Sequence, residues 1–291
     1  MPDGSVFINE PMKKHTTFRI GGPADYFIMP SNEKELEETI RVCREFSIPI
    51  YIVGNGSNLL VGDKGFRGAI IQLYKSMGTF QVEGNQITAQ AGCSLAQIAN
   101  AALDAALTGF EFAAGIPGTL GGAVVMNAGA YGGEMKDVLA SVRVMTEEGE
   151  IMELPAEELG LGYRTSIIPE KRYIVLGAVI SLTEGKKEEI KAQMDDLRQK
   201  RVSKQPLEYP SAGSTFKRPE GYFAGKLIQD AGLRGFQVGG AQVSEKHCGF
   251  VINKDQATAS DVMNLMNQVS DKVYEEFGVR LQPEVKRLGE F

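Results

Sequence analysis

The sequence feature that most constrains the fold is a stretch without a single charged side chain, residues 112–133. Its length suits a membrane-spanning helix, but its many glycines, together with Pro117 and Asn127, would break such a helix. We therefore interpret the stretch as a glycine loop that leads into a short helix. Glycine lets a phosphate approach backbone N–H groups closely, and the start of a helix favours negative charge. The stretch predicts a site for an anionic group.

A second glycine-rich segment, residues 54–60, follows a strand expected over residues 49–53. A Rossmann turn needs the pattern G-x-G-x-x-G between a strand and a helix. The residues after position 60 do not have a helical pattern, and the residues before Gly115 do not have a strand pattern. The two glycine segments therefore indicate a nucleotide site that is not of the Rossmann type.

Composition limits the function classes. The 291 residues suggest two or three domains, and a hydrophobic content of 43% is ordinary for a globular protein. With 31 basic and 37 acidic residues, the net charge is −6, and no basic stripe favours nucleic acid as a partner. Three scattered cysteines and two histidines suggest neither a disulfide framework nor a metal site. No secretory signal is present at the N-terminus, so we expect a cytoplasmic protein without a membrane anchor.

Capping and periodicity predict a mixture of helices and strands. Asn32 should begin one helix, Ser94 and Gln97 should form a capping box on another, and Gly278 should end a long helix over residues 260–277. A stretch rich in Pro, Gly and Ser, residues 205–219, marks the last domain boundary. Further helices are expected over 186–201 and 223–229, and strands over 25–29, 69–73, 79–82, 86–90, 141–145, 150–154, 172–182, 236–243, 249–253 and 279–285.

Several separate motifs occur in an order that resembles one enzyme family. Gly-Asn-Gly-Ser-Asn-Leu-Leu over 54–60, Gly-Ile-Pro-Gly over 115–118 and Asn-Ala-Gly-Ala-Tyr over 127–131 are similar to motifs of the UDP-N-acetylenolpyruvoylglucosamine reductase family. The similarity extends from Thr-Thr-Phe-Arg-Ile-Gly-Gly over 16–22 to Pro-Glu-Val over 283–285. The resemblance therefore covers nearly the whole chain. The segment over 245–250, Glu-Lys-His-Cys-Gly-Phe, departs from the pattern that is more common in the family.

The resemblance implies an α+β fold, in which a two-lobed FAD-binding domain of the vanillyl-alcohol-oxidase/PCMH type precedes a smaller α+β substrate-binding domain. We expect the first FAD-binding lobe over residues 1–75, the second lobe over 76–204 and the substrate-binding domain over 205–291. The implied activity is that of a flavin-dependent oxidoreductase in peptidoglycan precursor synthesis. It would reduce UDP-N-acetylglucosamine enolpyruvate to UDP-N-acetylmuramate through noncovalent FAD, with NADPH as co-substrate.

The family's catalytic residues match three positions here. Arg164 matches the catalytic arginine, whose planar fork of donors suits a carboxylate that gains charge. Ser214 matches the proton donor, and Glu284 matches the residue that helps to stabilise the enolate. Without the resemblance, they would be interpreted as a surface arginine, a turn-forming serine and a solvated glutamate.

The resemblance and the glycine loops also predict binding residues. Lys217 and Gln229 are expected to contact the phosphates of the substrate, although exposed positions on the surface are the ordinary alternative. The residues expected to bind FAD are Gly54, Asn55, Gly56, Ser57, Asn58, Leu59, Gly115, Gly118, Thr119, Gly122, Asn127 and Arg201.

Two other functions are compatible with the sequence. One is another FAD-dependent oxidoreductase or oxidase on the same scaffold, which would consume oxygen with an alcohol substrate. The other is a non-catalytic nucleotide-binding module, which would bind a nucleotide without oxidising NADPH. The three catalytic matches favour the reductase, and this preference is based on family analogy.

Overall fold

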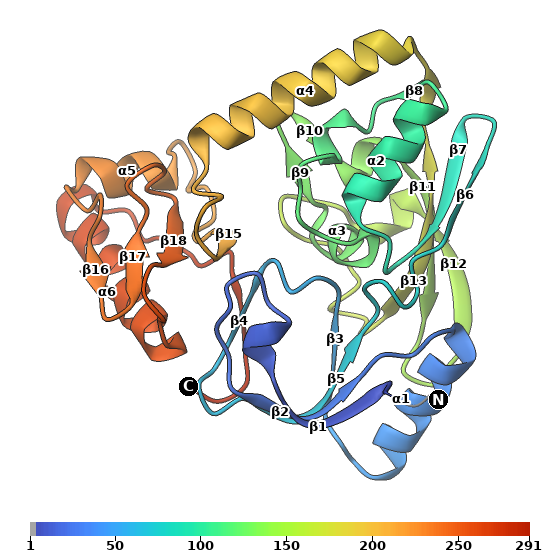
Figure 1. Ribbon diagram of the computed structural model, residues 1–291, viewed down its shortest axis with the longest axis horizontal. Helices are drawn as coiled ribbons and strands as arrows, with labels where there is room; N and C mark the ends of the chain where they lie inside the picture. Colours follow the sequence, from blue (N-terminus) through green and yellow to red (C-terminus); the bar gives the residue numbers. More distant parts are fainter. Residues whose placement is uncertain (1–3) are drawn as a thin grey trace. The chain divides into compact units, whose positions relative to one another are not determined.

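A computed structural model of the chain describes residues 4–291 and contains two compact units (Figure 1). The first unit comprises Met1–Phe7, Phe27–Asn55 and Gly68–Arg201, and the second comprises Ile8–Tyr26, Gly56–Arg67 and Val202–Phe291. Each unit therefore combines segments that are far apart in the sequence. The division into lobes over 1–75 and 76–204 and a domain over 205–291 stays a prediction, and its residues 1–3 lie outside the described part of the chain.

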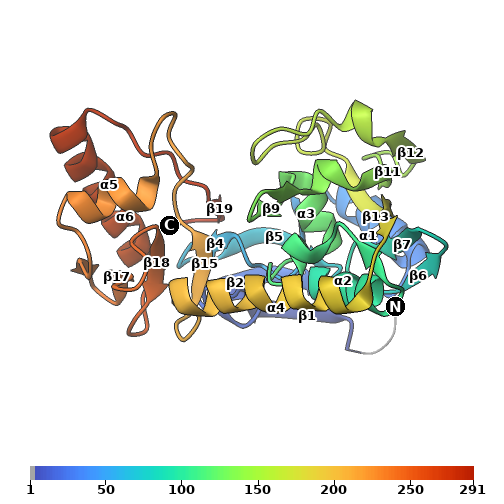
Figure 2. The ribbon, with the colours of Figure 1, turned by 90° about the horizontal axis from the view of Figure 1, so that it is seen from above.

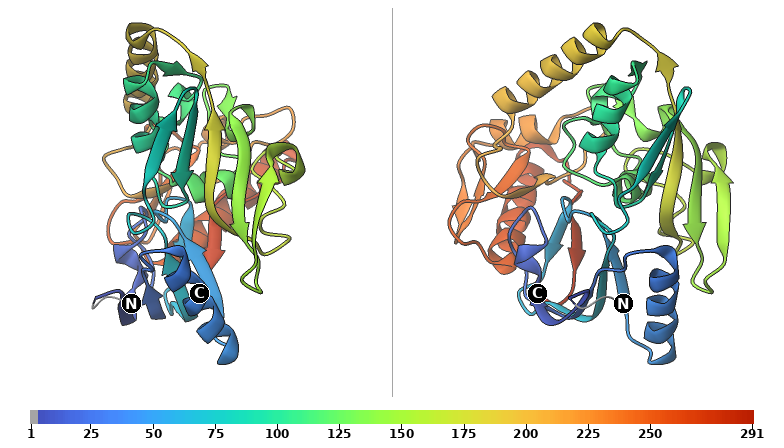
Figure 3. Two further views of the ribbon diagram at one scale, coloured as in Figure 1. Left: turned by 90° about the vertical axis from the view of Figure 1, so that its right-hand side faces the viewer. Right: turned by 45° about the vertical axis from the view of Figure 1, so that its right-hand side comes forward.

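The first unit is organised around a five-stranded antiparallel sheet. Figure 3 shows its strands side by side. In β7, the buried Ile87 and Ala89 alternate with more exposed residues, so this strand turns one face to the core, whereas the central strand β13 is buried along most of its length. In spatial order the strands are β12 (Ile151–Pro155), β11 (Leu139–Met145), β13 (Ile174–Ser181), β7 (Gln86–Gln90) and β6 (Phe80–Glu83).

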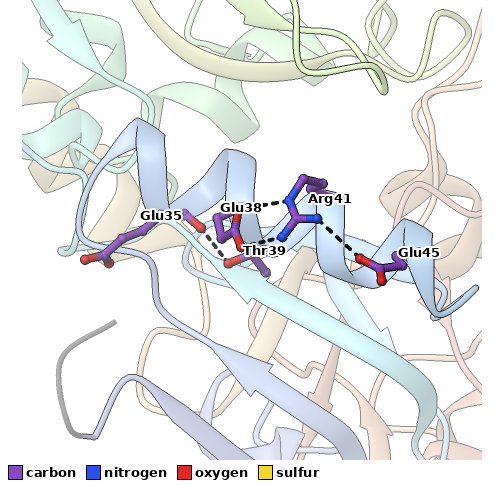
Figure 4. A network of polar contacts seen from close by, with 5 residues as sticks. All are labelled: Glu35, Glu38, Thr39, Arg41 and Glu45. Atoms are coloured by element: carbon purple, nitrogen blue, oxygen red, sulfur yellow. Dashed lines mark hydrogen bonds and ion pairs between the residues drawn. The ribbon is translucent and has the colours of Figure 1, made fainter.

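The helices of the first unit begin where the sequence predicts. Helix α1 (Glu33–Glu45) starts after Asn32, whose side chain accepts a hydrogen bond from the N–H of Glu35. Helix α2 (Leu95–Asp104) has the expected capping box of Ser94 and Gln97. On the outer surface of α1, Arg41 joins Glu38 and Glu45, as Figure 4 shows. Both predicted helix starts are therefore confirmed.

The uncharged stretch also folds as predicted. It forms a loop, then the short helix α3 (Leu120–Met126), which packs on β13. The buried residues of α2, α3 and the five-stranded sheet form one hydrophobic core, which includes Leu95, Leu120 and Val142. Among residues 4–291, no helix has the length and apolar character needed to cross a membrane. The glycine loop thus packs against the edge of this core through Ala114 and Ile116, which are partly buried there.

Smaller sheets occur in the part of the chain before residue 205. A four-stranded sheet has the order β1 (Val6–Pro11), β2 (Pro23–Ile28), β5 (Phe66–Gln72) and β3 (Ile50–Val53), with β3 and β5 parallel. Two-stranded sheets pair β9 (Gly129–Ala130) with β10 (Gly133–Glu134), and β8 (Leu107–Thr108) with β14 (Thr183–Glu184). The long, polar helix α4 (Lys187–Lys204) follows β14. Within the described residues, the single-turn helices are η1 (Met12–Lys14), η2 (Glu111–Ala113), η3 (Met135–Asp137) and η4 (Ala156–Leu159).

The second unit contains a four-stranded antiparallel sheet and two helices, α5 (Ala224–Asp230) and α6 (Ala259–Phe277), which lie against each other in Figure 2. Helix α6 ends at Gly278 in a left-handed conformation, as the sequence predicts. The apolar side of α6 forms a separate core with residues such as Phe216 and Val251. The strand order is β15 (Ser211–Ser214), β18 (Phe250–Asn253), β17 (Ala241–Val243) and β16 (Gln237–Val238).

Three strand predictions were wrong or incomplete. Residues 236–243 form two short strands, because Gly239, with φ of +55°, turns the chain between β16 and β17. Residues 279–285 are not a regular strand; the strand follows as β19 (Lys286–Leu288) and pairs in parallel with β4 (Leu59–Val61). Strand β15 lies in the stretch that the sequence suggests is only a boundary.

Candidate functional site

The two glycine loops meet within the first unit. The side chain of Asn55 donates a hydrogen bond to the carbonyl oxygen of Pro117 at 2.8 Å. A Cβ atom on Gly54 would lie 2.1 Å from Oγ1 of Thr119, so only glycine allows this approach. Gln72 Nε2 donates a hydrogen bond to the carbonyl oxygen of Gly54 at 3.1 Å, which helps to hold the first glycine loop in place. Two segments predicted independently to bind a nucleotide thus form one surface.

Arg201 lies beside the second glycine loop. A Cβ atom on Gly115 would be 3.1 Å from Nη1 of Arg201, so the guanidinium lies directly against the loop backbone. Burial lowers the pKa of Arg201, and the nearby Tyr131 acts in the opposite direction. A cation that has lost this much water gains stability from an anionic or strongly polar partner. Gly115 and Arg201 together therefore form a suitable place for a phosphate. Gly118 and Gly122 lie in the same segment, and Gly122 leaves room for ordinary contact with Thr119.

The side chain of Asn127 is fully buried and hydrogen-bonds to Glu134, Gly162 and Lys136. Asn127 ends α3 in a left-handed conformation, which asparagine tolerates better than most residues. Its Nδ2 donates to Oε2 of Glu134 at 2.9 Å and to the carbonyl oxygen of Gly162 at 3.0 Å. Its Oδ1 accepts a hydrogen bond from the N–H of Lys136 at 2.9 Å. The amide is thus engaged by protein groups, and its predicted contact with FAD stays a prediction.

Arg164 stands at a tight turn that Asn127 supports. Gly162 and Thr165 form an isolated antiparallel bridge, and Arg164 between them has φ of +57°. Its Nη2 donates to the carbonyl oxygen of Gly129 at 3.3 Å, and its guanidinium lies 5.2 Å from the ring centroid of Tyr163. A non-glycine residue in this region is strained, and such strain is typical of functional positions.

In the second unit, the remainder of the first glycine loop is tightly packed. Gly56 has φ of +61°, and a Cβ atom there would lie 2.3 Å from the carbonyl oxygen of His15. Ser57 is half-buried, and Leu59 is buried in β4. Asn58 Nδ2 donates to the carbonyl oxygen of Glu284 at 3.2 Å. A residue predicted to bind FAD therefore also contacts the backbone of a predicted catalytic residue.

The structure brings Ser214 and Glu284 onto adjacent backbone segments. Ser214 is exposed at the end of β15, opposite Phe250 of β18. The N–H of Glu284 donates to the carbonyl oxygen of Thr215 at 2.8 Å, and Phe216 bridges to Pro283. Two predicted catalytic residues, far apart in the sequence, are thus joined by one hydrogen-bonded connection.

The predicted substrate-binding residues lie in the same unit. The N–H of Lys217 donates to the carbonyl oxygen of Gln282 at 2.8 Å, which extends the connection that holds Glu284. Gln229 is exposed on α5, and its Oε1 accepts a hydrogen bond from Nη2 of Arg234 at 2.7 Å. Arg234 therefore orients Gln229. No motif in the sequence identifies Arg234 as a residue of the site.

The segment over 245–250, which departs from the more common family pattern, has a structural role in the second unit. Nδ1 of His247 accepts a hydrogen bond from the N–H of Gly249 at 3.1 Å, and Cys248 is buried. Burial lowers the pKa of His247 below its ordinary value. The ring stacks edge-on against Phe250, with centroids 5.0 Å apart. These contacts support the strand that faces Ser214.

Comparison with known proteins identifies the family. A model of the C-terminal domain of UDP-N-acetylenolpyruvoylglucosamine reductase matches residues 205–288, and a model of an FAD binding domain matches residues 24–155. The UDP-N-acetylenolpyruvoylglucosamine reductases of Agathobacter rectalis and Caldanaerobacter subterraneus are each 56% identical to the chain, over 100% of it and 96% of their own length. The chain belongs to the UDP-N-acetylenolpyruvoylglucosamine reductase family.

A solved structure supports the fold of this reductase family member. The UDP-N-acetylenolpyruvylglucosamine reductase of Thermus caldophilus superposes with a TM-score of 0.84 and is 37% identical. The match covers 97% of this chain and 98% of that structure. The predicted α+β architecture, with a two-lobed FAD-binding domain and a substrate-binding domain, is thereby confirmed.

The residues of the first unit fit the FAD of a reductase of this family. The glycine loops offer backbone N–H groups at a place where a side chain at Gly54 would be excluded. The buried guanidinium of Arg201 supplies the positive charge that a pyrophosphate needs. In this unit, Gly54, Asn55, Gly115, Gly118, Thr119 and Arg201 would hold the cofactor.

Two residues that position this site, Glu134 and Thr215, were not predicted from the sequence. Glu134 connects Asn127 and Lys136, whose ammonium lies 3.0 Å from it. The hydrogen bond from Lys136 contributes most to lowering the pKa of Glu134, and the bond from Asn127 adds to it. Thr215 follows Ser214 directly and is buried. No local pattern reveals Thr215, because it follows β15 and its hydrogen-bond partners lie in distant segments.

Proposed function

We propose that Arg164, Ser214 and Glu284 carry out the reduction of UDP-N-acetylglucosamine enolpyruvate to UDP-N-acetylmuramate in this chain. As a member of the family, the chain is a flavin-dependent oxidoreductase of peptidoglycan precursor synthesis, with NADPH as its co-substrate. The observation that carries the assignment of roles is the hydrogen bond from the N–H of Glu284 to the residue beside Ser214. It supports the view that a proton donor and a carboxyl group act on one substrate.

The reaction adds a hydride and a proton across the enol ether double bond. When bound, FAD would supply the hydride-transfer chemistry that links NADPH to the terminal alkene carbon. Electron density then increases on the carbon that bears the carboxylate and on the carboxylate itself. The residues of the chain must stabilise this charge and deliver a proton to that carbon.

Each proposed catalytic residue has one task. Arg164 donates its planar fork of hydrogen bonds to the substrate carboxylate as negative charge develops. Ser214 transfers its hydroxyl proton to the carbon beside the carboxylate and then regains a proton from solvent. Glu284 helps to stabilise the enolate that forms.

Binding energy far from the reacting carbons orients the substrate. Lys217 supplies positive charge for the diphosphate, and Gln229, held by Arg234, supplies an amide donor. Asn58 belongs to the cofactor loop and also bonds the backbone of Glu284. The supply of NADPH and nucleotide sugars in the cytoplasm supports a cytoplasmic location for the reaction.

The test is the oxidation of NADPH by the purified protein, with and without UDP-N-acetylglucosamine enolpyruvate. We expect rapid oxidation only when the enolpyruvate is present, together with formation of UDP-N-acetylmuramate. Equal rates with and without it would contradict the assignment. Oxygen consumption with an alcohol substrate would instead indicate an oxidase on the same scaffold.

A further inference from the structure

Thr215 is a buried polar residue that the reaction described above does not use. Only 4% of its surface is exposed, whereas Ser214 beside it is exposed. Ser214 ends β15, and the chain bends directly after it, where the side chain of Thr215 is buried. A buried threonine in an apolar core needs hydrogen-bond partners.

The polar groups of Thr215 contact two other segments of the second unit. Its N–H donates to the carbonyl oxygen of Gly249 at 2.9 Å, and its Oγ1 accepts a hydrogen bond from the N–H of Val251 at 2.9 Å. Its carbonyl oxygen accepts a hydrogen bond from the N–H of Glu284 at 2.8 Å. Thr215 therefore joins the strand that carries Ser214 both to β18 and to the segment that carries Glu284.

The regular strand ladder alone does not define the position of Ser214. The pairing of β15 with β18 is irregular between Ser211 and Ser214, and Gly213 in this interval has φ of +76°. The hydrogen bond between Thr215 Oγ1 and Val251 fixes the chain directly after this irregularity. This bond depends on the side chain, whereas the two backbone bonds would be available to other residues.

We propose that Thr215 is a positioning residue that sets the distance between the hydroxyl of Ser214 and the carboxyl group of Glu284. The proposal rests on the function proposed above, because both groups must reach the same substrate carbon region. A displacement of about 1 Å between reacting groups lowers a rate by roughly 100-fold. The side chain of Thr215 fixes the chain beside Ser214 to Val251 of β18, and its carbonyl oxygen accepts the hydrogen bond from the N–H of Glu284.

The test compares three variants in two half-reactions followed by flavin absorbance. Thr215→Val keeps the shape but loses the acceptor for Val251, and Thr215→Ser keeps the acceptor. Thr146→Val is the control, because Thr146 is also buried and its Oγ1 also accepts backbone hydrogen bonds, at 3.2 Å from Glu148 and 3.3 Å from Glu150.

We expect Thr215→Val to retain bound FAD and reduction by NADPH. Its reoxidation by the enolpyruvate substrate should fall roughly 10- to 100-fold, with a changed pH profile, and Thr215→Ser should restore most of the rate. Thr146→Val should leave the ratio of the two half-reactions unchanged. Should the valine variant fail to fold, Thr215→Cys, with its weakly accepting thiol, takes its place in the same comparison.

A double-mutant cycle separates positioning from a general structural role. In a Ser214→Ala background, the hydroxyl to be positioned is absent, so Thr215→Val should cost much less than it does in the parental enzyme. Fully additive losses, or parental reoxidation by Thr215→Val, would overturn the proposal. Equal loss in both half-reactions would also overturn it. A parental enzyme that the enolpyruvate does not reoxidise would instead refute the proposed function.

Discussion

The side-chain amide of Asn127 donates a hydrogen bond to the carbonyl oxygen of Gly162 at 3.0 Å. This bond joins the left-handed end of α3 to the turn that presents Arg164. The same amide also holds Glu134, so the uncharged glycine stretch and the arginine turn form one connected structure. The position of Arg164 is thus determined by residues that need not touch the substrate.

Asn127→Ala should destabilise the protein by about 2–4 kcal/mol, because several buried hydrogen-bonding groups lose their partner. Chemical denaturation measures the change in the free energy of unfolding. Asn100→Ala, at an exposed position of α2, is the control and should change it by less than about 0.5 kcal/mol. Similar values for the two variants would show that the buried network contributes little.

Arg164→Gly should be more stable than Arg164→Ala by about 1 kcal/mol, because only glycine avoids the strain of φ at +57°. Both variants lose the guanidinium, so reoxidation of the flavin by substrate should fall in both. Comparing the two by chemical denaturation isolates the backbone contribution. An alanine variant as stable as the glycine variant would contradict the inferred strain.

Gly56→Ala should destabilise the second unit by more than about 2 kcal/mol and lower the bound FAD, because the new Cβ meets the His15 carbonyl oxygen. Gly84→Ala is the matched control: φ is +57° there, but nothing lies within 4 Å of the added Cβ. It should cost only about 1 kcal/mol of left-handed strain. Flavin absorbance and thermal unfolding measure both effects, and equal losses would argue against close packing at Gly56.

Glu134 should give the protein a pH-dependent stability. Its pKa in the folded state is lowered from the ordinary 4.5, chiefly by the hydrogen bond from Lys136. The carboxylate therefore contributes stability above pH 4.5, and this contribution is lost as the pH falls through the lower, folded-state pKa. Glu134→Gln should be less stable than the parent at pH 7, by about 1 kcal/mol for a partly exposed pair.

Denaturation between pH 7 and acid checks this prediction. The difference between Glu134→Gln and the parent should shrink below pH 4.5. Glu158→Gln, at an exposed position, serves as the control. A difference that stays constant with pH would mean that the hydrogen bonds to Glu134 do not depend on its charge.

Ser214→Ala should leave FAD content and flavin reduction by NADPH nearly unchanged, because neither process uses the hydroxyl. Reoxidation by substrate should slow by roughly 10²- to 10⁴-fold, the usual contribution of a positioned general acid. Anaerobic stopped-flow absorbance separates the two steps. Ser211→Ala, at the other end of β15, should behave like the parent, and parental reoxidation by Ser214→Ala would point to another proton donor.

The sequence was sufficient for features that depend on neighbouring residues. The Asn32 cap, the Ser94 capping box and the Gly278 terminus are local hydrogen-bonding or backbone preferences, and the structure confirms all three. That the two glycine loops bind a nucleotide stays a prediction from their motifs. Their meeting at Asn55 and Pro117 is a tertiary contact that no local pattern specifies.

The features that could not be predicted depend on long-range pairing. Strand β15 lies in a stretch rich in Pro, Gly and Ser, and it is stabilised by β18 rather than by its own propensity. Strand β19 has three residues and depends on β4 for its hydrogen bonds. The supporting roles of Thr215 and Glu134 likewise arise from segments that meet only in the folded chain.

The parallel pairing of β4 with β19 has a consequence for how the protein is made. Asn58 and Glu284 are 226 residues apart, so a ribosome exposes the first glycine loop long before the segment that contacts it. Closing so long a loop is entropically costly and slows folding. During synthesis, the edge of β4 therefore remains unpaired until nearly all the chain has emerged. A shortened chain that stops before Lys286 would leave this edge open to other strands, and aggregation would accompany the loss of activity.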